Sequence, residues 1–190
     1  MWRGSRKEPG TALIPAGYMA KRIQPRPEWL TAPQVVDVRS LSGCISENFA
    51  DYISYWRHNG YWLFDSPEII RSVAAEDSVS LLGTCFFYYE AHEMEFDGNG
   101  WVPFSPESSL HTDVLVPRQK LLNGYDVVTF FARSSPECSP LSCNGLAEHI
   151  RTNQHCLFGS FADAETSLNK GDFRNSEPGP YRIFAVYALE

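Results

Sequence analysis

The order of apolar and polar positions predicts strands over much of the chain. Residues 81–96 are rich in aromatic side chains and residues 181–189 are nearly continuous in β-forming residues, so both indicate central strands. Residues 97–100 carry two dipeptides typical of tight turns and predict a hairpin into a strand at residues 101–104. Shorter extended segments are expected at residues 12–19, 35–38, 61–64, 114–116 and 125–132.

Helical signals are fewer. The strongest spans residues 46–60, where Ser46 suits the N-cap and four apolar side chains share one helical face: Phe49, Tyr52, Ile53 and Trp56. Ser66 followed by Pro67 predicts a second helix start, and Ser160 with Asp163 resembles a capping box for a third. A fourth helix is expected to start near Gly145.

These elements predict an α+β fold, with a mixed, mainly antiparallel sheet and about four helices packed on it. The 190 residues fit a single domain, 1–190, with residues 1–11 loosely attached because they lack periodicity. We detect no internal repeat in the sequence.

Composition supports one substantial core, because 43% of the residues are hydrophobic and 14% are aromatic. The net charge of −7 is uneven: residues 1–40 carry seven basic and three acidic side chains, whereas residues 41–190 carry nine and twenty. Phosphate neutralisation supplies most of the affinity for duplex nucleic acid, so an acidic body argues against that partner. The basic N-terminal segment is expected to pack against the acidic body.

No apolar run approaches the roughly 18 to 20 residues that a membrane-spanning helix needs. The N-terminus has basic residues without a continuous apolar segment behind them, so a signal peptide is not expected. A cytoplasmic protein without membrane contact is the resulting expectation.

The five cysteines cannot all pair within one chain, and cytoplasmic thiols are mostly reduced. Cys44 and Cys85 read as small buried hydrophobic residues. The other three lie in residues 125–156, where a strand, a loop rich in Ser, Pro and Cys, and a helix start follow one another. This loop, residues 134–146, is the candidate ligand or catalytic site.

A thiol-dependent enzyme is the first hypothesis for the loop. Cys138 or Cys143 is then the nucleophile and His155 our candidate base, with His92, His111 and His149 left open. A helix N-terminus lowers the pKa of a nearby thiol and stabilises developing negative charge. Three residues at the expected helix start are therefore the candidate ligand-binding groups: Ser142, Asn144 and Gly145.

Two other hypotheses compete at the same loop. Cys138, Cys143, Cys156 and His155 are residue types that bind zinc, but their spacing suits a tetrahedral site poorly, so no metal or other cofactor is predicted. Alternatively, the prolines and serines order the loop and the cysteines fill small gaps.

A non-enzymatic function is also open. P-loop, dinucleotide-binding, nucleophile-elbow and zincin motifs are absent from the sequence. The aromatic helix expected at residues 46–60, with Tyr55 off its apolar face, suits a protein-interaction module. A small molecule or a protein therefore remains the expected partner, and the sequence leaves enzyme and binding module undecided.

Overall fold

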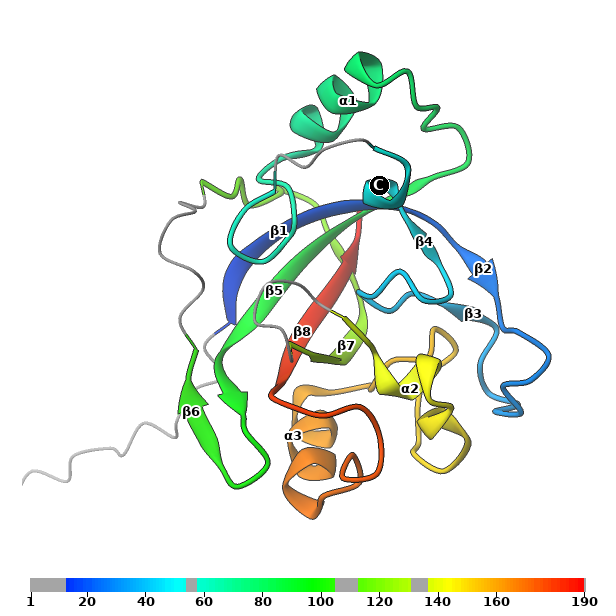
Figure 1. Ribbon diagram of the computed structural model, residues 1–190, viewed down its shortest axis with the longest axis vertical. Coiled ribbons are helices and arrows are strands. Elements are labelled where there is room, and N and C mark those ends of the chain that lie inside the picture. The colour runs from blue at the N-terminus through cyan, green and yellow to red at the C-terminus, as the bar shows by residue number, and fades with distance from the viewer. Residues whose placement is uncertain (1–12, 54–57, 105–112, 131–136, 190) are drawn as a thin grey trace, which may run out of the picture.

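The computed structural model describes residues 13–53, 58–104, 113–130 and 137–189, and the fold is given for these ranges. Its main feature is a curled antiparallel sheet of order β4-β1-β5-β8-β7, in which β6 extends one end of β5 (Figure 1). The strands of this sheet are β1 (Leu13–Arg22), β4 (Glu47–Asn48), β5 (Cys85–Phe96), β6 (Trp101–Pro103), β7 (Leu121–Thr129) and β8 (Tyr181–Ala188). A separate two-stranded ribbon pairs β2 (Gln24–Pro25) with β3 (Asp37–Val38).

Helices are short and few in the described ranges. Two have three turns or slightly less, α1 (Pro67–Glu76) and α3 (Phe161–Lys170), whereas α2 (Pro140–Cys143) is a single turn. Two 3-10 turns complete the set, η1 (Phe49–Tyr52) and η2 (Leu146–Glu148). The helix α1 packs against β1, and α3 packs against β7 and β8.

The predicted α+β class, with a mixed sheet and about four packed helices, is therefore wrong. Every strand pairing in the described ranges is antiparallel, and the sheet dominates over three short helices. The error arose because two helical patterns, in the described residues 46–53 and after Gly145, form 3-10 turns and not α-helices. The segment at residues 114–116 is not a strand either.

The expected helix at residues 46–60 is absent from its described part. Glu47 and Asn48 pair with β1 as β4, and only one 3-10 turn, η1, follows. Asn48 has extended backbone geometry and accepts a hydrogen bond from buried Lys21, while its backbone N–H donates to Asp51. These tertiary contacts outweigh the helical periodicity, since propensity is a weak prior. Tyr55 and Trp56 lie outside the described residues.

Local signals were read correctly at several other elements. Ser66 and Ser160 cap α1 and α3 by accepting hydrogen bonds from the third helical residue of each, as predicted. The hairpin at residues 97–100 joins β5 to β6 as predicted. The inner strand expected near residues 181–189 is β8, which is paired on both sides.

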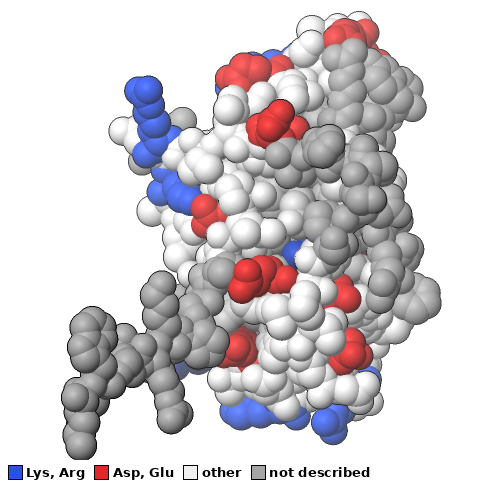
Figure 2. Space-filling model, turned by 90° about the vertical axis from the view of Figure 1, so that its left-hand side faces the viewer, with Lys and Arg blue, Asp and Glu red and all other residues white. Residues whose placement is uncertain are grey.

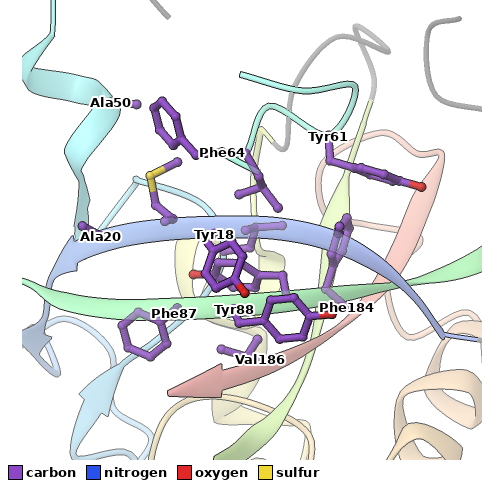
Figure 3. Close-up of a cluster of buried hydrophobic side chains, with 14 of the residues drawn as sticks. Tyr18, Ala20, Ala50, Tyr61, Phe64, Phe87, Tyr88, Phe184 and Val186 are labelled. Carbon is purple, nitrogen blue, oxygen red and sulfur yellow. The ribbon is translucent and has the colours of Figure 1, made fainter. Parts of the chain in front are cut away.

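The core is largely aromatic. Tyr18 of β1 and Tyr88 of β5 lie beside each other with their ring centroids 5.1 Å apart, and Tyr61 meets Phe184 edge-on (Figure 3). This cluster extends to α1, whereas a second buried cluster joins α3 to β7 and β8. Many of the aromatic side chains of the sequence thus pack on the two faces of one sheet.

The pairing of β5 with β8 has an approximate two-fold axis, which passes through the pair Tyr89–Val186. Rotation by 180° about this axis maps each residue pair of the two strands onto another pair, so the register is unchanged. The exchanged pairs are Phe87–Ala188 with Ala91–Phe184, and Tyr88–Tyr187 with Glu90–Ala185. The outer strands obey the same rotation, because Tyr18 lies opposite Tyr88 and Tyr125 lies opposite Ala185.

Each half of the chain repeats the same elements around this axis. The first strand shifts register just before a glycine, at Gly17 in β1 and Gly124 in β7. The next residue bridges to a distant phenylalanine, in the pairs Tyr18–Phe64 and Tyr125–Phe158. A helix with a serine cap follows, and then the strand at the axis.

Glycine is required at both register shifts. The φ angles are +140° at Gly17 and +146° at Gly124, a region that side chains disfavour. A Cβ at Gly17 would lie 2.6 Å from the Cβ of Leu63, and one at Gly124 would lie 2.6 Å from the carbonyl oxygen of Phe158.

An asparagine ties each half together. Its side-chain oxygen accepts from two backbone N–H groups of its own turn, and its amide donates to the carbonyl before the glycine. In the first half Asn59 contacts Tyr61, Leu63 and Ala16, and in the second half Asn153 contacts His155, Leu157 and Asn123. The structure thus contains an internal repeat, and the prediction that there is none is wrong.

The repeated asparagines lead to a stability prediction. We expect Asn59→Ala and Asn153→Ala each to lower the free energy of unfolding by about 2–4 kcal/mol, because each leaves several backbone groups without partners. Chemical denaturation measures the loss, with exposed Asn175→Ala as the neutral control. Equal stability of either variant and the wild type would contradict the structural role.

Candidate functional site

Three cysteines from two distant parts of the chain meet in one cluster. The Sγ atoms of Cys44, Cys138 and Cys143 all lie within 4.8 Å of one another. Cys44 is exposed, Cys143 is half-buried and Cys138 is buried, so the cluster reaches from the interior to the surface. We refer to these three residues as the three-cysteine centre.

The predicted cysteine loop supplies two members of this centre through a tight turn. Cys138 continues the edge of β7 by pairing its backbone with Thr129, and α2 then ends at Cys143. Asn144 is the C-cap of α2, and Gly145 follows with φ +70°. The helix start expected near Gly145 is present only as the 3-10 turn η2, whose N-cap is Gly145, while Asn144 ends α2. Neither short turn has a long-helix dipole to offer a thiol.

Buried Asp126 of β7 holds the two cysteine-bearing segments together. Its Oδ2 accepts hydrogen bonds from the backbone N–H of Leu41 at 2.7 Å and from the hydroxyl of Ser139 at 2.7 Å. Ser139 directly follows Cys138, and Leu41 lies three residues before Cys44. One carboxylate oxygen thus fixes the distance between the segments that carry Cys44 and Cys138.

Buried Lys21 of β1 holds the segment that carries Cys44 from near the opposite edge of the sheet. Its ammonium donates to the carbonyl oxygen of Ser42 at 2.9 Å and to the side-chain oxygen of Asn48. The hydroxyl of Ser42 lies 3.4 Å from the Sγ of Cys143. Ser42 therefore links Lys21 to the three-cysteine centre.

Strand register places Lys21, Tyr89 and Asp126 on one face of the sheet. Residues paired across two strands lie on the same face, and so does every second residue along one strand. The pairs Lys21–Cys85, Tyr89–Val186 and Asp126–Phe184 connect the three residues in this way. Lys21 and Asp126 lie near opposite edges of the sheet, yet they contact the neighbouring residues Ser42 and Leu41. The sheet therefore curls toward this face. We call it the inner face.

Burial dominates the electrostatics of the inner face. It lowers the pKa of Lys21 to about 7 and raises the pKa of Asp126 to about 7, because each loses hydration in its charged form. Burial also raises the pKa of Tyr89. The hydroxyl of Tyr89 and the Oδ1 of Asp126 are buried and have no hydrogen-bond partner within the described ranges.

The three thiols influence each other strongly. Hydrogen bonds from the thiols of Cys138 and Cys143 lower the pKa of Cys44, while Cys138 has its pKa raised by its contacts with Cys143 and Cys44. Lys21 also favours the thiolate of Cys44. These contacts therefore favour the thiolate form of Cys44, the exposed member of the centre, and disfavour that of buried Cys138.

The other predicted site residues lie elsewhere. His155 is bound to Asp37, with its Nδ1 2.7 Å from the carboxylate, and Cys156 is buried in the cluster around α3. Burial raises the pKa of Cys156 to about 12. The centre thus brings together Cys138 and Cys143 but not His155 or Cys156. Ser142 is close: its hydroxyl lies 3.8 Å from the Sγ of Cys143.

Sequence reasoning missed three residues of the site. Cys44 and Cys85 were read as buried, yet both are exposed, and Cys44 belongs to the centre. Lys21 and Asp126 were not considered at all. A charged residue within an apolar strand pattern was the available signal, since such residues are rarely fully buried without a specific partner.

A surface cavity of about 730 Å³ lies apart from this chemistry, between the Asn153 turn and α3. Its lining mixes basic His149, Arg151 and Lys170 with acidic Asp163 and Asp172, and includes none of the cysteines. Such a lining selects neither an anion nor a cation. We therefore place the candidate site at the three-cysteine centre.

Comparison with protein-family models, curated proteins and solved structures found no match. None of the helices in the described ranges has the length and apolarity to cross a membrane. The face shown in Figure 2 has acidic groups scattered over its middle and basic groups toward its margins. Function must therefore be argued from the chemistry of the site.

The buried carboxyl of Asp126 leads to a pH prediction. Its folded pKa is raised from 3.8 to about 7, so the stability that it contributes is present at low pH and is lost as pH rises from about 4 to about 7. Asn lacks this titration. We expect Asp126→Asn to gain stability relative to the wild type across this pH range, by up to roughly 4 kcal/mol.

Urea denaturation of both proteins, metal-free, at several pH values between 4 and 8 measures this difference. Lys21, Cys143 and Tyr89 are charged or titratable groups near Asp126, and they are present in both proteins, so they cancel to first order. A stability difference that is independent of pH would show that Asp126 is already ionised at low pH.

Proposed function

We propose that this protein binds a soft divalent metal ion, of which zinc is the simplest, through the thiolates of Cys44, Cys138 and Cys143. The observation that carries the proposal is the approach of the three Sγ atoms to within 4.8 Å of one another. In a tetrahedral zinc site with bonds of about 2.3 Å, thiolate sulfurs lie roughly 3.8 Å apart. The three sulfurs need only a small contraction to reach that spacing.

The surroundings suit such a centre. Three thiolates and one Zn²⁺ carry a net charge of −1, and Lys21 brings a positive charge close by. The sulfur donors come from segments that Asp126, Ser139 and Ser42 hold in place, so the site is largely organised before metal binds. Preorganised ligands with their own hydrogen-bond support are typical of metal sites.

A site with three protein ligands leaves a fourth position for water or for a donor atom of another molecule. Exposed Cys44 places this position at the surface. Zinc sites of this open type are the ones that act on substrates, whereas structural zinc sites are closed by four protein ligands. The proposal is thus a metal centre that can exchange its fourth ligand.

A thiol-dependent activity without metal is the second candidate, favoured by the exposure of Cys44 and its lowered pKa. In that case Cys44, rather than Cys138 or Cys143, is the better nucleophile. The interaction module proposed for residues 46–60 has less support, since Phe49 is buried in the core and residues 46–53 form no α-helix.

Metal titration tests the proposal. Chelator-treated protein should take up one zinc per chain in competition with a chromophoric chelator, and cobalt should give thiolate charge-transfer absorption. Cys44→Ser should weaken zinc binding by about 100-fold or more, because a structural zinc site gains roughly 10–16 kcal/mol from its ligands together. Cys85→Ser, which changes the other exposed cysteine, should leave the affinity unchanged.

The two candidates give different results in this experiment. No zinc uptake, combined with rapid single alkylation at Cys44, would replace the metal centre with a thiolate nucleophile. Neither uptake nor preferential alkylation would remove both. Equal losses in Cys44→Ser and Cys85→Ser would indicate a different ligand set.

A further inference from the structure

The two halves of the molecule provide a comparison within one chain. Positions that serve the fold carry similar residues in both halves, as do Gly17 and Gly124, or Asn59 and Asn153. The two-fold rotation places Lys21 at the position of Val128. It maps Cys85 onto Arg182, and Lys21 pairs with Cys85 as Val128 pairs with Arg182. Both residues are fully buried.

An apolar residue therefore suffices for the fold at this position. A buried ammonium is unfavourable unless it is well paired. The presence of a lysine at position 21, where the equivalent residue is Val128, therefore indicates a role beyond the fold. The same comparison equates Asp126 with Met19, which is also buried. Lys21 and Asp126 of the inner face thus stand where the other half has apolar residues.

The contacts of Lys21 all concern one segment. Its ammonium donates to Ser42 and to Asn48, and Cys44 lies between these two residues. Asp126, Asp51, Cys44 and Cys143 are the acidic and thiol groups that influence it electrostatically. Of these, Cys44 and Cys143 belong to the three-cysteine centre.

We propose that Lys21 is a positioning residue of the three-cysteine centre, which supplies the counter-charge for its thiolate sulfurs and holds the segment that carries Cys44. This inference rests on the proposed metal-binding function. Replacing three thiol protons with Zn²⁺ changes the charge of the centre from 0 to −1. The ammonium form of Lys21 favours that change through Coulomb attraction, and the anionic centre in turn favours the protonated form of Lys21.

Three substitutions of Lys21 separate charge from shape. Lys21→Met removes both the charge and the hydrogen bonds and resembles the Val128 position, whereas Lys21→Gln keeps a neutral donor for Ser42. Lys21→Arg retains the charge. Arg182→Met is the matched control, because Arg182 is the other fully buried cation of the inner face in the described ranges, and it lies among Tyr61, Phe104 and Phe130.

The zinc affinity and the rate of Cys44 alkylation by iodoacetamide in the metal-free protein are measured at pH 7. We expect Lys21→Met and Lys21→Gln each to weaken zinc binding by about tenfold or more and to slow alkylation by a similar factor. Lys21→Arg should recover at least part of both, and Arg182→Met should match the wild type in both.

Wild-type values in Lys21→Gln, together with a loss in Lys21→Met, would show a purely structural role and overturn the inference, as would wild-type values in both. Should Lys21→Met fail to fold, Lys21→Gln decides. Absence of zinc binding by the wild type overturns the proposed function instead. The alkylation rates then still decide whether Lys21 favours the thiolate of Cys44.

Discussion

The pairing of β5 with β8 about the Tyr89–Val186 axis is the constraint on which the rest of the structure depends. Each half alone provides one long antiparallel strand pair, β1–β5 or β7–β8, and one ten-residue helix, and isolated two-stranded pairs are marginally stable. Joining the two halves through β5 and β8 produces a continuous sheet whose inner face is buried. The interior that holds Lys21 and Asp126 exists only because both halves contribute to it.

The candidate site arises where the two halves differ. In each half, a long connection leads from the first strand to the asparagine turn, ending at Asn59 or Asn153. Cys44 lies in the first connection, and Cys138 and Cys143 lie in the second, so the three-cysteine centre forms where equivalent connections meet. Residues common to both halves maintain the fold, and residues found in one half form the candidate site.

Short-range signals in the sequence predicted short-range structure. The serine caps at Ser66 and Ser160 and the hairpin at residues 97–100 depend on neighbours within four residues, so the sequence pattern contained them. The helix expected at residues 46–60 failed because Lys21 and β1 hold Asn48 in extended geometry. Contacts of that range are invisible to a periodicity argument.

The internal repeat did leave a trace in the sequence. An asparagine is followed at the same spacing by Leu-Phe and then by the serine cap in both halves, as Asn59, Leu63–Phe64 and Ser66, and as Asn153, Leu157–Phe158 and Ser160. The surrounding residues differ, so these few matched positions are the similarity that the two halves share around the turn. Two of the three cysteines of the candidate centre, Cys138 and Cys143, were predicted, but the approach of Cys44 depends on the fold of the whole chain.

Buried charge links the stability of this fold to its proposed chemistry. Lys21 and Asp126 stand where Val128 and Met19 show that apolar residues are accepted, and uncompensated burial of each charge costs several kcal/mol. The proposed anionic metal–thiolate centre beside Lys21 would offset part of that cost, because it would pair the ammonium with a fixed negative charge. Metal binding should therefore stabilise the folded chain by more than the ligand bonds alone, through the same residue that organises the centre.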